Sequence, residues 1–278
     1  MTSPLQTIQQ AQRQSPLPLL EQHMLWGHVL GVSRAWLIAH DRDPIAAADW
    51  QHYHDLQARR LEGTPMAYLL GWREFMGHRF EVGPGVLIPR PETEILVTHV
   101  LQNVLPRFQH PRILDLGTGS GIVAISLALE CPQATVVATD VCPTALSWAK
   151  KNARTLCGGN IDFLQGSWYD ALSAQDTFDV IVSNPPYIAA ADVHLAQGDL
   201  RAEPTQALTD GQDGLQFLQA IIAGAPQFLR SEGALWVEHG WNQHQAVREL
   251  MLKEGFSEVR SIHDLASIPR ISGGTINL

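Results

Sequence analysis

The chain has 278 residues, 45% of them hydrophobic and 17% charged, which is ordinary for a globular protein of one large or two modest domains. Its net charge of −9 argues against nonspecific binding to nucleic acid, which usually needs a basic face. No apolar run approaches the roughly 18 residues of a membrane helix, and the first residues lack a signal-peptide pattern. Three cysteines without a CxxC pair favour reduced thiols in a cytoplasmic protein over disulfides or zinc.

The N-terminal part shows helical spacing and no strand pattern. Apolar residues predict helices over 17–30, 33–40 and 44–61, with a last turn over 65–71. We expect a small bundle with Trp26, Trp36 and Trp50 in its core. Nothing in it is typical of catalysis, so any function of this bundle is expected to be the binding of a macromolecular partner.

A connector follows the bundle. Residues 72–82 alternate between apolar and polar side chains, which predicts a β-hairpin. Pro91 suits the first turn of a helix, so residues 83–94 fit either a plain linker with a helix cap or the edge of a lid over a ligand site. We place the boundaries of the bundle, the connector and the main domain at 1–75, 76–88 and 89–278.

The main domain opens with a nucleotide-binding turn. A buried strand over 112–116 leads into the glycine loop 117–121, and a helix over 122–129 follows. A second strand, 134–139, ends in Asp140, about 20 positions after the loop, where an acidic residue can accept hydrogen bonds from ribose hydroxyls. The pattern predicts a ligand of nucleoside type.

The loop differs from the dinucleotide pattern G-x-G-x-x-G, and the chain has no triphosphate signature. Asp115-x-Gly117-x-Gly119-x-Gly121 resembles motif I of class I S-adenosylmethionine-dependent methyltransferases. The resemblance implies that the loop holds S-adenosylmethionine, without a metal, that Asp115 lies near its methionine amino end and that Asp140 holds its ribose. The loop residues concerned are Gly117, Thr118, Gly119, Ser120 and Gly121.

A third strand, 160–165, precedes Trp168. In this fold a residue at that position sits beside the adenine, so Trp168 could form a wall for the base; the alternative is a Trp packed on a loop. Asp170 and Asp176 are expected to be solvated loop acids.

The fourth strand, 178–183, stops abruptly at Asn184-Pro185-Pro186-Tyr187 because two prolines remove two backbone donors. Asn184 therefore lies at the carboxyl end of a strand, where ligands bind in open α/β sheets. The Asn184 side-chain oxygen and the Pro185 carbonyl can each accept one N–H hydrogen bond. Together they could orient a planar NH2 group for in-line methyl transfer. Tyr187 can cover that group. The tetrapeptide is the motif of methyltransferases that act on the amino groups of adenine, cytosine or glutamine.

The remaining chain predicts a long loop over 189–211, which we expect to line the substrate channel. A helix over 214–229, a fifth strand over 233–238 and a helix over 242–254 follow in the chain. Strands over 257–262 and 270–278 complete a seven-stranded Rossmann-like sheet of the class I α/β type, in the order 3-2-1-4-5-7-6. His239 is expected to be structural.

Taken together, the chain resembles the HemK/PrmC family of protein-(glutamine-N5) methyltransferases. The resemblance rests on the segments 67–71, 88–94, 115–121, Asp140, 182–188, 203–204, 213–215 and 238–240. It implies methylation of the glutamine in the Gly-Gly-Gln loop of peptide chain release factors, with release of S-adenosylhomocysteine. It further implies a cytoplasmic monomer with no direct nucleic-acid or membrane binding. Ser120 stands where a second threonine is common in the family.

Two other functions remain open at this point. An N6-adenine nucleic-acid methyltransferase would use the same tetrapeptide, although the acidic balance and the lack of a basic recognition insert argue against it. A non-catalytic nucleotide-binding subunit could use the N-terminal bundle for assembly.

Overall fold

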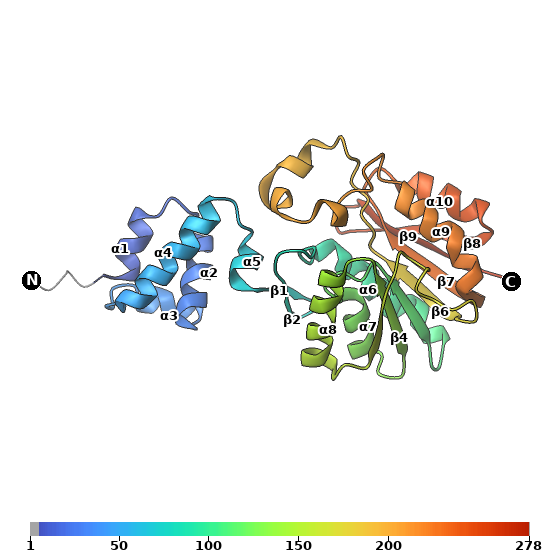
Figure 1. Cartoon of the computed structure of the whole chain (residues 1–278), viewed down its shortest axis with the longest axis horizontal. Helices are drawn as coiled ribbons and strands as arrows, with labels where there is room; N and C mark the ends of the chain where they lie inside the picture. The colour runs from blue at the N-terminus through green and yellow to red at the C-terminus, as the bar shows by residue number, and fades with distance from the viewer. Residues whose placement is uncertain (1–5, 278) are drawn as a thin grey trace, which may run out of the picture. The chain divides into compact units, whose positions relative to one another are not determined.

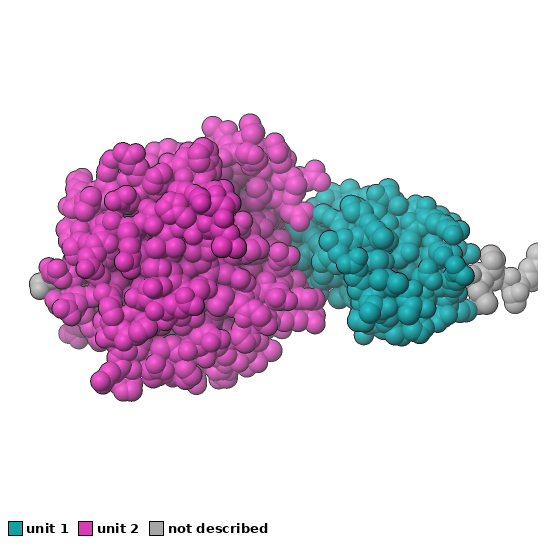
Figure 2. Space-filling view, turned by 180° about the vertical axis from the view of Figure 1, so that it is seen from behind, with its two compact units in different colours: residues 1–71 teal, residues 72–278 magenta. Residues whose placement is uncertain are grey.

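A computed structural model of the chain describes residues 6–277. The start of the chain, which was expected to carry no signal peptide, falls mostly on residues 1–5, outside this range. The chain forms two compact units, residues 1–71 and 72–278 (Figure 2). The division precedes the expected boundary at residue 75 because Trp72 already pairs with Glu81 in a hairpin. None of the helices in the described part is long and apolar enough to span a membrane.

The first unit contains five helices within the described residues. They are α1 (Ile8–Gln14), α2 (Leu19–Leu30), α3 (Arg34–Ala39), α4 (Ala47–Leu61) and α5 (Met66–Leu70) (Figure 1). Local chemistry sets their ends: the Ser33 hydroxyl accepts the Trp36 N–H at the start of α3, and Gly31 ends α2 with φ 67°. The first helix was not predicted, although Thr7 and Gln10 form a capping box at its start.

The tryptophans of this unit differ in burial. Trp26 is fully buried and stacks on Tyr53 with ring centroids 4.1 Å apart, while Trp50 is half-buried. The prediction of a core position for Trp36 was wrong, because its side chain is 38% exposed and stacks on His40 of the same helical segment. In a helix of one and a half turns, apolar spacing does not say which face is covered.

The second unit begins with the hairpin β1 (Trp72–Phe75) and β2 (His78–Glu81) and is built on a seven-stranded sheet. From one edge to the other, its strands are β5 (Ile161–Gln165), β4 (Thr135–Asp140), β3 (Arg112–Leu116), β6 (Phe178–Ser183), β7 (Leu229–Glu238), β9 (Pro269–Ile276) and β8 (Phe256–His263). The five strands from β5 to β7 are parallel, and β9 is antiparallel to both of its neighbours. Counted in chain order, this is 3-2-1-4-5-7-6, so the predicted fold class is confirmed.

Helices cover both faces of the sheet, which explains why β3 and β6 are almost wholly buried and mostly apolar (Figure 1). One core contains side chains of α6 (Glu94–His99), α7 (Ile122–Glu130) and α8 (Pro143–Cys157). The other contains side chains of α9 (Gln216–Phe228) and α10 (His244–Lys253). Along β3 the side chains alternate between these cores, with Ile113 in the first and Leu114 in the second. Short helical turns occur at Pro91–Thr93, Val100–Val104, Leu105–Arg107, Val193–Ala196, Gly198–Ala202 and Thr205–Ala207.

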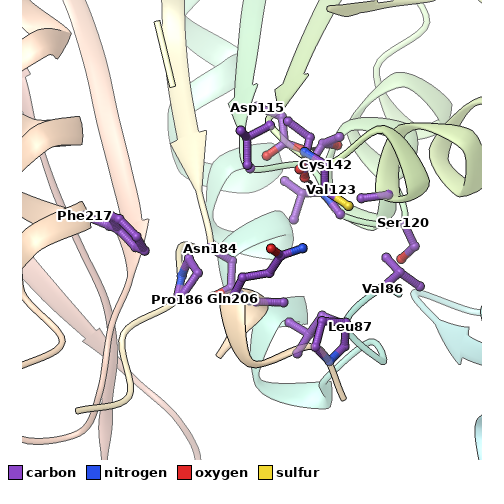
Figure 3. A pocket seen from close by; sticks show the side chains of 18 of the residues that line it. Val86, Leu87, Asp115, Ser120, Val123, Cys142, Asn184, Pro186, Gln206 and Phe217 are labelled. Atoms are coloured by element: carbon purple, nitrogen blue, oxygen red, sulfur yellow. Dashed lines mark hydrogen bonds between the residues drawn. The ribbon is translucent and has the colours of Figure 1, made fainter. Parts of the chain in front are cut away.

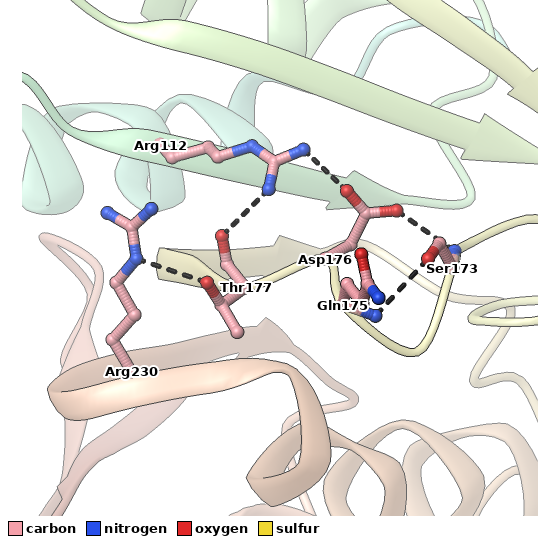
Figure 4. A network of polar contacts seen from close by, with 6 residues as sticks. All are labelled: Arg112, Ser173, Gln175, Asp176, Thr177 and Arg230. Carbon is pink, nitrogen blue, oxygen red and sulfur yellow. Dashed lines mark hydrogen bonds and ion pairs between the residues drawn. The ribbon is translucent and has the colours of Figure 1, made fainter.

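A polar network lies at the amino ends of β3 and β6, away from Asn184 (Figure 4). Arg112 donates to Asp176 at 2.6 Å and to the Thr177 carbonyl at 3.1 Å, and Arg230 donates to the Thr177 hydroxyl at 3.3 Å. The hydrogen bond from Arg112, together with one from the Ser173 N–H, lowers the pKa of Asp176. Asp176, which was expected to be a solvated loop acid, is therefore half-buried and bonded to Arg112. Asp170, the other acid expected to be solvated, is exposed.

Candidate active site

A cavity of about 210 Å³ lies at the carboxyl ends of β3, β4 and β6 (Figure 3). Most of the residues predicted for the ligand site line it together: Gly117, Thr118, Gly119, Ser120, Asp140, Trp168, Asn184 and Pro186. Gly121, which was also predicted to contact the ligand, does not line the cavity and lies at the start of α7. Sheet register explains the meeting of two of these segments. Leu116 pairs with Ser183, whose hydroxyl donates to the Leu116 carbonyl at 2.7 Å, so the next residues, Gly117 and Asn184, leave the sheet side by side.

Backbone hydrogen bonds tie the start of the glycine loop to the end of β4. The N–H groups of Gly117 and Thr118 both donate to the Thr139 carbonyl, at 2.9 and 3.0 Å. Gly121 begins α7 with φ 85°, and a Cβ there would meet Ile125 Cδ1 at 2.7 Å. Only glycine fits this backbone and this approach. The preceding loop residues, Gly117 to Ser120, line the cavity.

Two carboxyl groups face the cavity from the ends of neighbouring strands. Within the described residues, Asp115 accepts hydrogen bonds through Oδ2, from the Thr118 hydroxyl at 2.6 Å and from the Ala124 N–H at 3.1 Å, which leaves Oδ1 for a ligand. Asp140 accepts the Gly119 N–H at Oδ2 and the Cys142 N–H at Oδ1, and each oxygen keeps a second lone pair.

Burial governs the titration of both acids. It raises the pKa of Asp115 to about 7, against hydrogen bonds from Thr118 and Ala124 that act in the opposite direction. Burial also raises the pKa of Asp140. Asp115 is buried and Asp140 is half-buried. A cationic ligand in the cavity would favour the ionised form of both carboxyl groups.

Trp168 forms part of the cavity wall. Its carbonyl accepts the Thr139 hydroxyl at 2.9 Å, and its ring would lie 3.2 Å from a Cβ at Gly117. Phe217 of α9 packs against it with ring centroids 5.3 Å apart. A flat apolar wall beside the glycine loop suits an aromatic base. This placement supports the prediction that Trp168 packs against the adenine, which stays a prediction.

The four residues of the Asn-Pro-Pro-Tyr segment lie in different surroundings. Asn184 and Pro186 line the cavity, whereas Pro185 is buried. Tyr187 does not line the cavity, and its hydroxyl donates to Glu238 Oε1 at 3.0 Å. Its predicted role as a cover for the acceptor group remains untested.

The connector and the long loop supply the remaining walls of the cavity. Val86 and Leu87 line it, on the side away from Asp115 (Figure 3), together with Pro204, Gln206 and Ala207 of the loop. The position of Val86 and Leu87 favours the lid-edge interpretation of the connector over a plain linker.

A buried carboxylate ties these two walls together. Glu203 accepts the Ile88 N–H at 2.9 Å and Arg90 Nη2 at 2.5 Å, and its side chain is fully buried. Sequence reasoning gave no role to Glu203, Thr93 or Glu238. All three fall in segments that carry the family resemblance, which was the available signal.

Two family descriptions match the chain. "PrmC N-terminal domain" matches residues 5–71, and "Methyltransferase small domain" matches residues 91–211. The chain is 58% identical over 258 residues to the release factor glutamine methyltransferase of Bordetella pertussis, covering 93% of this chain and 95% of that one. It is 50% identical over 269 residues to the enzyme of the same name from Burkholderia pseudomallei, covering 95% and 94%.

A solved structure shows the same fold at low identity. The Thermus thermophilus 16S rRNA N2 G1207 methyltransferase, in complex with S-adenosylmethionine and guanosine, matches with a TM-score of 0.56 and 19% identity. The match covers 74% of this chain and 50% of that one. At this identity the likeness concerns the class I methyltransferase fold alone.

Proposed function

This chain belongs to the release factor glutamine methyltransferases, and we propose that it methylates the side-chain amide nitrogen of a glutamine in a release factor, using S-adenosylmethionine. The acceptor would be the glutamine of the Gly-Gly-Gln motif, as the family resemblance implies. The observation that carries the proposal is that Asn184 lines the same cavity as the glycine loop and Asp140.

The residues of the cavity fit the donor. S-adenosylmethionine supplies a methyl group on a sulfonium, which is already activated for transfer. The loop residues Gly117 to Ser120 line the cavity and offer close backbone approach. Asp115 Oδ1 could accept from the methionine ammonium, and Asp140 has lone pairs for the ribose hydroxyls. Trp168 could pack on the adenine. The two acids, Asp115 and Asp140, also suit a ligand that carries a sulfonium and an ammonium.

Asn184 and Pro185 would orient the acceptor. An amide nitrogen is a poor nucleophile because its lone pair is delocalised into the carbonyl group. If Asn184 Oδ1 and the Pro185 carbonyl each accept one N–H, they hold the NH2 group in line with the methyl group and favour the pyramidal geometry that frees the lone pair. Proline keeps the second acceptor rigid at little entropic cost.

The experiment is a methylation assay with purified release factor and labelled S-adenosylmethionine. We expect label in the glutamine of the Gly-Gly-Gln peptide. DNA and RNA serve as alternative acceptors in parallel reactions. Label in nucleic acid and none in the release factor would identify the N6-adenine methyltransferase instead.

A further inference from the structure

The orientation of the Asn184 amide decides whether it can accept a hydrogen bond from the acceptor. Asn184 Nδ2 donates to Thr93 Oγ1 at 3.0 Å, which leaves Oδ1 for the cavity. Thr93 alone does not enforce this orientation, because a hydroxyl can accept from Nδ2 or donate to Oδ1. Thr93 is fully buried, so water does not compete for its hydroxyl. A further group must therefore fix the direction in which the Thr93 proton points.

Glu238, at the end of β7, is such a group. Its side chain is 1% exposed, and Oε1 accepts the Tyr187 hydroxyl at 3.0 Å. Oε2 is buried and has no hydrogen-bond partner at ordinary geometry among residues 6–277. The Thr93 hydroxyl interacts with this carboxyl group in the sense that favours its ionised form. A carboxylate only accepts hydrogen bonds, so it draws the Thr93 proton toward itself.

We propose that Glu238 and Thr93 are positioning residues for methyl transfer, which fix the Asn184 amide with Oδ1 toward the acceptor. In this arrangement Asn184 donates to Thr93 at 3.0 Å, and the Thr93 proton is directed toward the Glu238 carboxylate. The same carboxylate holds Tyr187, so it fixes both ends of the Asn-Pro-Pro-Tyr segment. This inference rests on the proposed function, because it concerns the residue that would bind the acceptor amide.

The direction of these bonds depends on the charge of Glu238. Burial raises the pKa of Glu238 to about 7, and the neighbouring Glu92 acts in the same direction. Thr93, Tyr187 and Arg270 act to lower it. A protonated Glu238 could donate to Thr93, which would then donate to Asn184 Oδ1 and turn the amide away from its working orientation. The turnover number at saturating donor should therefore rise with pH and reach a plateau above about 7.

The test compares two substitutions of Thr93 in the full-length enzyme, with release factor as acceptor and donor at saturation. Thr93→Val keeps the volume and removes the hydroxyl, and we expect the turnover number to fall about tenfold with the donor dissociation constant unchanged. Thr93→Ser keeps the hydroxyl and should restore most of that loss. Thr98→Val, a matched change on α6 whose hydroxyl faces Met76 Sδ at 4.0 Å, is the control and should match the wild type.

Equal turnover numbers for Thr93→Val and the wild type would overturn the inference, as would a loss in Thr93→Ser as large as in Thr93→Val. If Thr93→Val does not fold, Glu238→Gln takes its place. The Glu238→Gln variant should have a lower turnover number and should lose the rise of activity between roughly pH 6 and 8, the range around a pKa of about 7. A pH profile of the variant identical to that of the wild type would overturn the inference. An inactive wild type would instead contradict the proposed function.

Discussion

Replacing Glu203 tests whether the two walls of the donor cavity act as one structure. Glu203 joins Ile88, at the end of the connector, and the nearby Arg90 to the long loop through two hydrogen bonds, and its side chain is fully buried. Val86 and Leu87 of the connector and Pro204, Gln206 and Ala207 of the loop, which are close in sequence to the bonded residues, line the cavity. The substitutions Glu203→Gln and Glu203→Ala should therefore loosen both walls together.

The expected magnitudes follow from the bonds that are lost. A hydrogen bond to a charged group contributes about 1.5–3 kcal/mol. Glutamine keeps the shape and can still accept the Ile88 N–H, so Glu203→Gln should cost about 2 kcal/mol. Alanine leaves Arg90 and the Ile88 N–H without their partner, and Glu203→Ala should cost about 3–5 kcal/mol. For a unit of this size, roughly 2–4 °C of melting temperature is lost per kcal/mol.

The assay combines thermal unfolding with calorimetric titration of S-adenosylmethionine. If about 1.4 kcal/mol of the lost energy is needed to hold the walls for binding, Glu203→Gln weakens donor affinity tenfold. Glu130→Gln, at an exposed position at the end of α7, is the matched control and should change neither quantity. Wild-type donor affinity in Glu203→Ala, at a temperature where it is folded, would refute the coupling of the two walls.

Three further substitutions or conditions test the site. Asn184→Ala should abolish methyl transfer while calorimetry shows donor binding within a few-fold of the wild type; a variant that transfers methyl groups at the normal rate would remove the proposed clamp. Gly121→Ala should lose donor binding and melt at lower temperature, because its Cβ would lie 2.7 Å from Ile125 Cδ1 at φ 85°; normal binding would count against the loop geometry. Burial raises the pKa of Asp115 to about 7, so donor binding below pH 7 must release a proton from this carboxyl group. The affinity for the donor should therefore rise with pH, by at most about tenfold per pH unit, and level off above pH 7. Asp115→Asn should flatten this profile, and an unchanged slope would exclude Asp115 as its origin.

The ligand-free protein should show the opposite trend in stability. Asp115 and Glu238 both have raised pKa values in the folded state, so the folded state binds more protons than the unfolded state between about pH 4 and 7. Their contribution to stability is present at the lower end of this window and is lost as the pH rises through about 7. Chemical denaturation across this range measures it, with Asp115→Asn as the comparison.

The sheet and the position of the site could be predicted because their signals are local. The apolar runs of β3 and β6, the glycines of the loop and the prolines after Asn184 each act within a few residues. The strand order also follows from these segments once their class is recognised.

The supporting contacts could not be predicted because they join distant parts of the chain. Asn184 meets Thr93 across 91 positions, and Glu203 meets Ile88 across 115. From the sequence alone, Glu203 could as well be a solvated loop acid. Only the fold brings Ile88 to it. The start of β7 was missed for a different reason. The strand begins at Leu229, directly after α9, and its next three residues are polar and exposed, so they show no alternating pattern. The backbone is also irregular there, because Glu232 has φ 63°.

Mass spectrometry of the Gly-Gly-Gln peptide is the most direct measurement of the central claim. Release factor is incubated with S-adenosylmethionine and either the wild-type enzyme or Asn184→Ala, and the tryptic peptide that contains the motif is sequenced. The account predicts a single added methyl group on the glutamine side chain with the wild type and none with the variant. An unmodified glutamine after incubation with active, donor-binding wild-type enzyme would contradict it.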